Sequence, residues 1–139
     1  MKLIVLTDLW GTEKFDRFVN YQEQLKVATV ISDSCKLANV DTEVYEELNL
    51  HQQFVSGGVA KTVAKLLEKE KNAVNILAFS IAGTIACKAI LKGLKVNNWF
   101  AVSATRLRYE TEKPNCNIHL FYGEEDAFKP NKKGFNILR

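Results

Sequence analysis

Ser80 is the residue of this chain that is best placed to do chemistry. It follows the apolar run 73–79, and the small residues Ala82 and Gly83 come soon after it. A tight turn between a buried strand and a helix lifts a serine hydroxyl above the sheet, where it can act as a nucleophile. The alternative is that Ser80 caps the helix with its hydroxyl, a common role of serine. The coincidence of strand, small residues and helix favours the nucleophile.

A serine nucleophile also needs amide donors that hold the oxyanion formed when it attacks a carbonyl group. The backbone amide of Ile81, at the start of the expected helix, is the first candidate donor. The loop after the first strand is expected to supply the second donor, from Leu9 or Trp10. The positive end of the helix dipole would favour the same negative charge.

The loop 123–126, with the sequence Gly-Glu-Glu-Asp, offers a carboxylate at Asp126. A carboxylate is the usual group that orients a histidine base beside a serine nucleophile. The alternative is a turn residue in a solvated acidic cluster. The base is less evident, because His119 lies in the middle of an expected strand and His51 lies in the weakly patterned segment 41–54. We expect His119 to be a core or sheet-face residue.

The elements that must position these groups alternate between strands and helices. This alternation predicts an α/β fold with a mainly parallel sheet, arranged as a three-layer α/β/α sandwich. The strands are continuous apolar runs, as expected where helices cover both faces of a sheet. Strands are expected at 2–7, 27–31, 73–79, 98–103, 118–122 and 135–138, and helices at 15–25, 57–72 and 81–92. A loop with a short helix is expected at 41–54, and a polar connection at 32–39.

The candidate groups all fall at the carboxyl ends of expected strands. The segment 8–11 follows the first strand, Ser80 follows the third, and Asp126 follows the fifth. Ligands of open α/β sheets bind beyond the carboxyl ends of the strands, which share one edge when the strands are parallel. We therefore expect these groups to converge on that edge.

Three segments of the chain carry a resemblance to the α/β-hydrolase superfamily: 8–11, 78–82 and 122–130. The resemblance implies a minimal α/β-hydrolase-like fold, with Ser80 as the nucleophile and Asp126 as the acid of a catalytic triad. It also implies that Leu9 or Trp10, in the loop after the first strand, donates a backbone amide to the oxyanion.

The chain departs from the pattern of that superfamily at three places: the turn at Ser80, called the elbow below, the oxyanion loop and the histidine. Ala78 and Ala82 stand where the G-x-S-x-G motif has glycines, and Thr7-Asp8 stands where the oxyanion loop usually has His-Gly. The superfamily places its histidine after the last strand, whereas the printed sequence ends at Arg139, just after the last expected strand. A piece of a longer protein, an unusual base, or a degenerate fold that only binds would each account for this.

The connection 104–117 limits the size of the expected site. A parallel crossover needs about a dozen residues, so this segment cannot also hold a lid. We expect 1–139 to form a single α/β-hydrolase-like domain without a lid insertion, with an open, shallow site. Such a site suits a small ester or thioester, free or presented by a carrier. Trp10 and Phe128 are candidates for its apolar, substrate-binding wall, whereas Phe54 is expected in the core.

Together these observations predict a serine hydrolase of the esterase or thioesterase type, which acts through an acyl-enzyme on Ser80 and needs no cofactor. The main alternative is a non-catalytic α/β-hydrolase-like binding or scaffold protein, a pseudo-enzyme that lacks the triad histidine. A flavodoxin-like or nucleotide-binding protein is disfavoured, because the segment 8–11 has one glycine and no G-x-G-x-x-G motif follows the first strand.

Composition sets further limits. The net charge is +3 without a clustered basic face, which argues against nucleic-acid binding, and no apolar run reaches the length of a membrane span. Cys35, Cys87 and Cys116 are an odd number without metal-site spacing. They indicate a reduced, cytoplasmic protein without a metal site, in which the cysteines are buried apolar residues. An exposed first or last strand could pair with a second copy, which predicts a homodimer.

Overall fold

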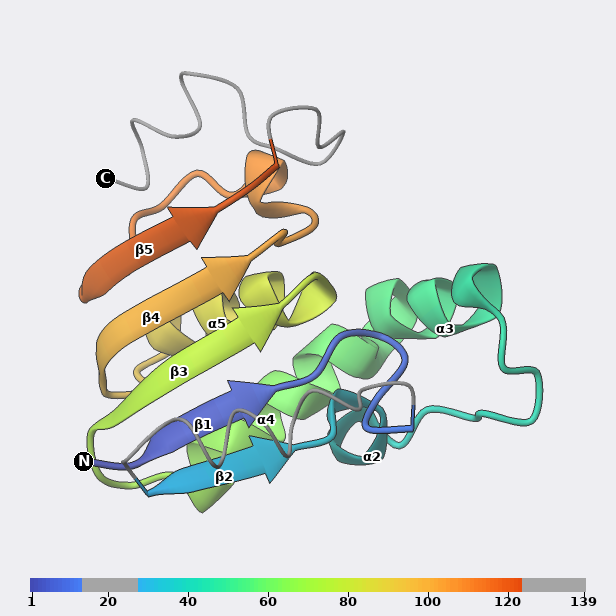
Figure 1. The fold of residues 1–139 in the computed structure, drawn as a ribbon, viewed down its shortest axis with the longest axis horizontal. Helices are drawn as coiled ribbons and strands as arrows, with labels where there is room; N and C mark the ends of the chain where they lie inside the picture. The colour runs from blue at the N-terminus through green and yellow to red at the C-terminus, as the bar shows by residue number, and fades with distance from the viewer. Residues whose placement is uncertain (14–27, 124–139) are drawn as a thin grey trace.

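A five-stranded sheet forms the centre of the structure, a computed structural model that describes residues 1–13 and 28–123. The strand order is β2-β1-β3-β4-β5, and all neighbouring strands run parallel (Figure 1). The strands are β1 (Leu3–Leu6), β2 (Thr29–Ser32), β3 (Val74–Phe79), β4 (Val96–Val102) and β5 (Asn117–Phe121). The expected α/β fold with a mainly parallel sheet is confirmed.

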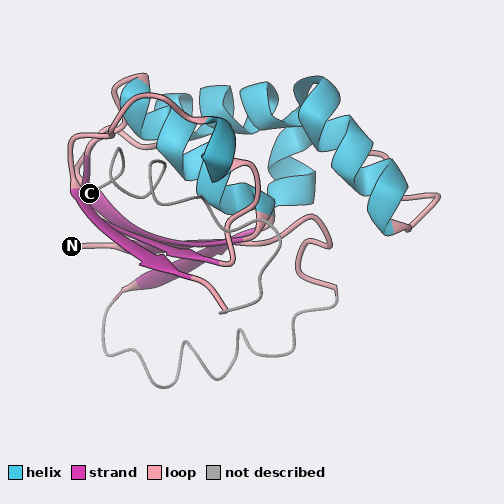
Figure 2. Ribbon diagram, turned by 90° about the horizontal axis from the view of Figure 1, so that it is seen from above, coloured by secondary structure: helices cyan, strands magenta, loops and turns pink. Residues whose placement is uncertain are grey.

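The described helices cover one face of this sheet (Figure 2). They are α2 (Ser34–Ala38), α3 (Glu47–Gln53), the π-helical turn η1 (Phe54–Gly58), α4 (Val59–Lys69), α5 (Ile81–Leu91) and the 3-10 turn η2 (Leu107–Tyr109). The opposite face of the sheet is apolar as well, because Val5 is fully buried and Leu3 and Phe79 nearly so. Two apolar faces are consistent with the expected α/β/α sandwich. No helix within the described ranges has the length and hydropathy needed to cross a membrane.

Helix α2 occupies a segment for which the sequence predicts only a polar connection. The carboxylate of Asp33 caps this helix by accepting a hydrogen bond from the amide of Lys36 at 3.2 Å. Asn39 ends it in the left-handed conformation, with φ of 53°. Both residues are common caps, but a helix of so few turns has too few apolar residues for a periodic pattern.

Gly57 separates α3 from α4. Its φ of 146° is a conformation that residues other than glycine rarely adopt. The helix expected to open at Gly57-Gly58 is α4, which begins at Val59 and ends at Lys69, earlier than the sequence pattern predicts. The expected helix at 15–25 and the expected strand at 135–138 lie outside the described residues.

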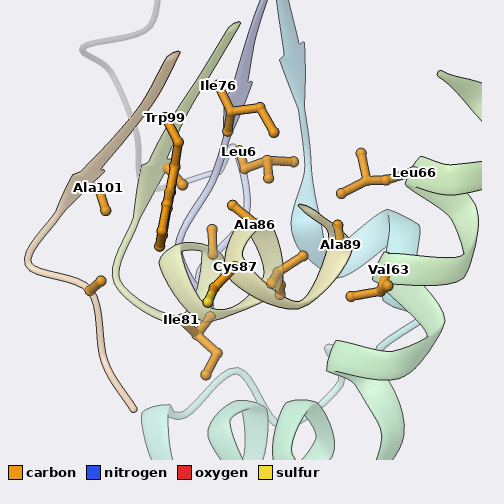
Figure 3. Packing of buried hydrophobic residues seen from close by; sticks show 14 of the residues in the cluster. Leu6, Val63, Leu66, Ile76, Ile81, Ala86, Cys87, Ala89, Trp99 and Ala101 are labelled. Atoms are coloured by element: carbon orange, nitrogen blue, oxygen red, sulfur yellow. The ribbon is translucent and has the colours of Figure 1, made fainter. Parts of the chain in front are cut away.

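Helix α5 lies at the centre of the core, where it packs on β3 and β4 and beside α4. Figure 3 shows Ala86 and Cys87 of this helix together with Trp99 of β4 and Ile76 of β3, and all four side chains are fully buried. Phe54 is also fully buried, so its expected place in the core is confirmed. The small residues of α5 allow this close packing, which fixes the position of the first turn of the helix.

Gly83 marks a close approach between α5 and the chain that leaves β4. A Cβ atom added to this glycine would overlap the Cβ of Ala104 and would lie 3.3 Å from its Cα. The hydroxyl of the next residue, Thr84, donates a hydrogen bond to the carbonyl of Thr105. The segment 104–105 is therefore held directly against the start of α5.

Strand β5 turns one row of side chains outward. His119 is exposed and stacks on Phe100, with ring centroids 4.6 Å apart and ring planes 13° apart. Phe121 lies in the same row, and 53% of its surface is exposed. The expectation that His119 is a sheet-face residue in the middle of a strand is confirmed.

The contact at Gly83 can be tested by adding a methyl group. We expect Gly83→Ala to lower the free energy of unfolding by about 1–3 kcal/mol, because the core must shift to admit the Cβ. In a double-mutant cycle with Ala104→Gly, part of this loss should be recovered, as measured by urea unfolding. Gly123→Ala is the matched control, since a Cβ there meets no atom of the described residues within 4 Å. Additive effects of Gly83→Ala and Ala104→Gly would contradict the contact.

Candidate active site

Ser80 occupies a strained turn between β3 and α5. Its backbone has φ of 55° and ψ of −122°, a conformation that L residues with a Cβ seldom adopt. A conformation of this kind costs about 1–3 kcal/mol and persists only where the surrounding structure enforces it. The turn is thus a feature that the rest of the fold maintains.

Three hydrogen bonds hold the backbone of Ser80 in this conformation. Its amide donates to the carbonyl of Val102 at 3.0 Å. Its carbonyl accepts from the amide of Gly83 at 3.0 Å and from the amide of Thr105 at 3.1 Å. Two of the partners belong to the end of β4 and the chain just after it. The neighbouring strand therefore clamps the serine on both sides of its Cα.

The hydroxyl of Ser80 does not cap helix α5. Ser80 occupies the N-cap position, but its side chain makes no capping hydrogen bond. The residue is half-buried, so part of its surface faces solvent. The interpretation of Ser80 as an ordinary helix cap is therefore wrong, and the hydroxyl remains available at the start of the helix.

The loop after β1 reaches the same edge of the sheet as Ser80. Strands β1 and β3 are neighbours, and their register pairs Leu6 with Ala78. Two residues further along, the two strands arrive at Asp8 and Ser80. The strand order also reverses here, because the chain moves outward from β1 to β2 and then returns to β3 on the other side. Such a switch point is where open α/β sheets bind ligands.

Two backbone amides at this edge are candidates for an oxyanion hole. The amide of Ile81 has no hydrogen-bond acceptor among the described residues, as is usual for the first amides of a helix. Within the same ranges, the amide of Leu9 has no acceptor either. The amide of Trp10, in contrast, donates to Oδ1 of Asp8 at 3.0 Å. Of the two expected donors, the geometry therefore favours Leu9.

The loop that carries Leu9 is fixed by residues of β2 and α2. The carbonyl of Leu9 accepts a hydrogen bond from the thiol of Cys35 at 2.9 Å. The buried hydroxyl of Thr7 accepts from the amide of Ser34 at 2.8 Å, and the Ser34 hydroxyl donates to the carbonyl of Thr7 at 2.7 Å. These partners are far from the loop in sequence, so no local pattern could reveal them.

Asp33 is a second anchor of this loop that the sequence does not reveal. Its Oδ2 accepts hydrogen bonds from both the amide and the hydroxyl of Thr12, each at 3.0 Å. Gly11 lies against the same carboxylate, and a Cβ on Gly11 would come within 2.7 Å of Oδ1. The φ of Gly11 is +69°, which glycine adopts at little cost. Asp33 thus caps α2 and ties down the end of the loop.

Trp10 lines a pocket of about 270 Å³ beside this loop. Its ring packs edge-on against Tyr45, with centroids 5.1 Å apart, and the Tyr45 hydroxyl donates to the Trp10 carbonyl at 2.6 Å. Acidic and basic side chains, Asp33 and Lys36 among them, also line the pocket. Ser80 is not among the residues that line this pocket, so the role of Trp10 in a substrate-binding wall stays a prediction.

The remaining predicted site residues are either outside the described part of the chain or not hydrogen-bonded to Ser80. Asp126 and Phe128 lie outside the described residues. His51 lies on α3 and His119 lies in the middle of β5. In the described part of the chain, neither histidine forms a hydrogen bond with Ser80. The described part of the chain also includes no cluster of three or more side chains that could hold a metal ion.

The environment of the cysteines keeps their thiols protonated. Burial raises the pKa of the Cys35 thiol to about 12, and the nearby carboxylates of Asp33, Asp8 and Glu13 add to the shift. Burial likewise raises the pKa of Cys87 to about 12. The expected role of these two cysteines as buried residues is confirmed. A protonated Cys35 is also what the hydrogen bond to Leu9 requires.

Comparison with known proteins supports the fold. No protein-family model matches the chain, and no curated protein matches it. A solved structure titled "m3DLH" is similar, with a TM-score of 0.62 and 11% sequence identity. The alignment covers 98% of this chain and 62% of that one, so the chain spans about three fifths of the length of this neighbour. At such low identity, the similarity establishes the shared α/β fold alone.

The strain at Ser80 predicts an unusual response to glycine. We expect Ser80→Gly to raise the free energy of unfolding by about 1 kcal/mol, because removing the Cβ relieves a cost that exceeds the entropic penalty of glycine. Ser56→Gly, at an exposed serine in η1, is the matched control. It should lower stability by about 0.5–1 kcal/mol, since its φ is not positive. Equal losses in both variants by thermal unfolding would contradict the strained turn.

The thiol of Cys35 predicts a change of stability with pH. Between pH 9 and about 12 this thiol ionises in the unfolded chain but stays protonated in the folded one, so stability should fall as pH rises. The contribution of Cys35 should decrease by up to about 1.4 kcal/mol per pH unit, measured as the difference between the wild type and Cys35→Ala in urea unfolding. A difference that is constant from pH 8 to pH 10.5 would contradict this assignment.

Proposed function

We propose that the protein is a serine hydrolase of the esterase or thioesterase type, built on an α/β-hydrolase-like fold, with Ser80 as its nucleophile. The observation that carries the proposal is the backbone of Ser80, with φ of 55° and ψ of −122° at a strand-to-helix turn. A strained turn of this type is the setting of the nucleophile in serine hydrolases of this architecture. A helix cap needs no such strain, and the Ser80 hydroxyl makes no capping bond.

The proposed reaction begins when Oγ of Ser80 attacks the carbonyl carbon of an ester or thioester. The carbonyl oxygen gains negative charge, which the amides of Ile81 and Leu9 stabilise by hydrogen bonds. Collapse of the intermediate expels the alcohol or thiol and leaves the acyl group on Ser80. Water then attacks this acyl-enzyme, releases the acid and restores the hydroxyl.

The proposal also needs a general base that takes the proton of Ser80. In the superfamily that the chain resembles, this base is a histidine oriented by an acid, and the resemblance assigns the acid to Asp126. The substrate proposed is a small ester or thioester, free or carried by a larger partner. The reaction uses no cofactor, since the attacking groups are a hydroxyl and water.

A second candidate function is that of a non-catalytic binding or scaffold protein on the same fold. The observation that favours it is the position of the two histidines. His119 stacks on Phe100 on the outer face of β5, and His51 lies on α3, so neither is hydrogen-bonded to Ser80 among the described residues. A serine without a base can still bind a carbonyl group but reacts slowly with it.

Labelling with a fluorophosphonate probe tests the proposed nucleophile. The protein, expressed from its complete gene, should form a covalent adduct that peptide mass spectrometry places on Ser80. Ser80→Ala should abolish the adduct and reduce ester hydrolysis by about 10⁴-fold or more, since the nucleophile is required for the covalent step. Ser56→Ala, at an exposed serine in η1, is the control and should label like the wild type.

The result that would overturn the proposal is the absence of a Ser80-dependent adduct in a protein that is folded. Thermal unfolding of Ser80→Ala verifies folding, because serine and alanine carry the same Cβ and should share the strain. A folded wild type that binds esters without labelling would instead support the binding protein.

A further inference from the structure

Arg106 lies next to the clamp that holds Ser80. The preceding residue, Thr105, donates its amide to the carbonyl of Ser80 at 3.1 Å. Consecutive Cα atoms are about 3.8 Å apart, so the backbone of Arg106 is also close to the elbow. The residue belongs to the connection that leaves the carboxyl end of β4, which is the edge of the sheet where Ser80 and Leu9 lie. Its side chain therefore starts from the same edge of the sheet as Ser80.

The guanidinium of Arg106 is held by an aromatic ring. Its Cζ lies 4.9 Å from the centroid of Tyr109, and Cζ of Arg108 lies 4.6 Å from the same centroid. Arg108 also donates a hydrogen bond to the Tyr109 hydroxyl at 3.0 Å. Stacking on an aromatic face orients a guanidinium while leaving the N–H groups at its edge available. The ring of Tyr109 thus orients the positively charged guanidinium of Arg106.

The charge of Arg106 is not neutralised by a carboxylate in the described ranges. The ion pairs found there are Lys2–Glu70 and Lys88–Glu110. Glu110 belongs to the same connection as Arg106, but its carboxylate is committed to Lys88 at 3.0 Å. Arg106 is half-buried, so its charge lies in a setting where an anion would bind more strongly than at a fully exposed arginine.

The chain around Arg106 has several features that cost free energy of folding. Ser103 and Arg106 both have positive φ, at 48° and 67°. Between them, the hydroxyl of Thr105 is buried without a hydrogen-bond partner among the described residues. Strain and unsatisfied polar groups concentrate at functional sites, because folding alone gives no reason to keep them. The segment 103–106 therefore has the unfavourable local features that are common at functional sites.

We propose that Arg106 binds a carboxylate of the substrate and so selects anionic esters or thioesters for attack by Ser80. This inference rests on the proposed function and extends it by naming the substrate class. The planar guanidinium donates two parallel hydrogen bonds to a carboxylate, which fixes the orientation of the substrate as well as its position. Arg108 acts through Tyr109, by holding the ring on which Arg106 stacks.

A pair of chromogenic esters measures this selectivity. The anionic ester is mono-4-nitrophenyl adipate, whose carboxylate is too distant to attack its own ester readily, and the neutral ester of similar length is 4-nitrophenyl hexanoate. For Arg106→Gln we expect kcat/KM to fall about 10- to 100-fold with the anionic ester, mainly through KM, because a hydrogen-bonded charge pair is lost. With the neutral ester, kcat/KM should change less than twofold. Arg106→Lys should restore part of the loss.

Lys95→Gln is the matched control for charge. It removes one positive charge from an exposed residue just before β4, at the opposite edge of the sheet. It should leave the ratio between the two esters unchanged, whereas a change equal to that of Arg106→Gln would reduce the effect to net charge and overturn the proposal. Arg106→Gly, which tolerates the positive φ, is a second variant if Arg106→Gln unfolds.

A binding measurement separates this inference from the proposed hydrolysis. Calorimetry on Ser80→Ala compares monomethyl glutarate, which carries a carboxylate, with neutral dimethyl glutarate. Tighter binding of the anionic ester, lost in Ser80→Ala/Arg106→Gln, supports the carboxylate site even if Ser80 never labels. Fluorophosphonate labelling of Ser80 without any preference for the anionic ester would leave the hydrolase intact and overturn the role of Arg106.

Discussion

The backbone clamp around Ser80 is the constraint on which the rest of the site depends. A serine at φ of 55° would relax if its peptide groups were free, but hydrogen bonds to Val102, Gly83 and Thr105 hold them. Two of these bonds come from the end of β4 and the chain just after it, and β4 is itself fixed in the sheet by its register with β3. The strain is therefore maintained by the central strands and by the first turn of α5, whose residues are buried.

The clamp also explains why the connection after β4 has its conformation. Gly83 lets Ala104 come into contact with α5, and the Thr84 hydroxyl binds the carbonyl of Thr105. Once these residues are held, the chain must turn sharply to continue, and Arg106 adopts a positive φ as it does so. The geometry that strains the serine thus also sets the backbone of the charged residue that follows Thr105. On the proposed function, nucleophile and specificity would share one structural origin.

Part of this arrangement could be predicted from the sequence, because some elements are marked by their own residues. β1, β3 and α5 are buried on nearly all sides, so their apolar character is continuous and their bounds are legible. The short helix α2 has no such pattern, since Asp33 and Asn39 mark its ends but few apolar residues lie between them. The sequence also did not show which of Leu9 and Trp10 is the better candidate oxyanion donor, because the Trp10 amide is engaged by the side chain of Asp8.

The sequence alone determined the α/β class, the strand that ends at Ser80 and the helix that follows it, because hydrophobic pattern and residue size are local properties. The tertiary structure decided that Ser80 is strained and does not cap the helix with its side chain, since two of the three hydrogen bonds that hold its backbone involve residues more than twenty positions away. It also decided that Cys35 and Asp33 secure the loop of Leu9 and that Arg106 stacks on Tyr109. Such contacts join separate strands at one edge of the sheet, so they exist only once the parallel strands are in register.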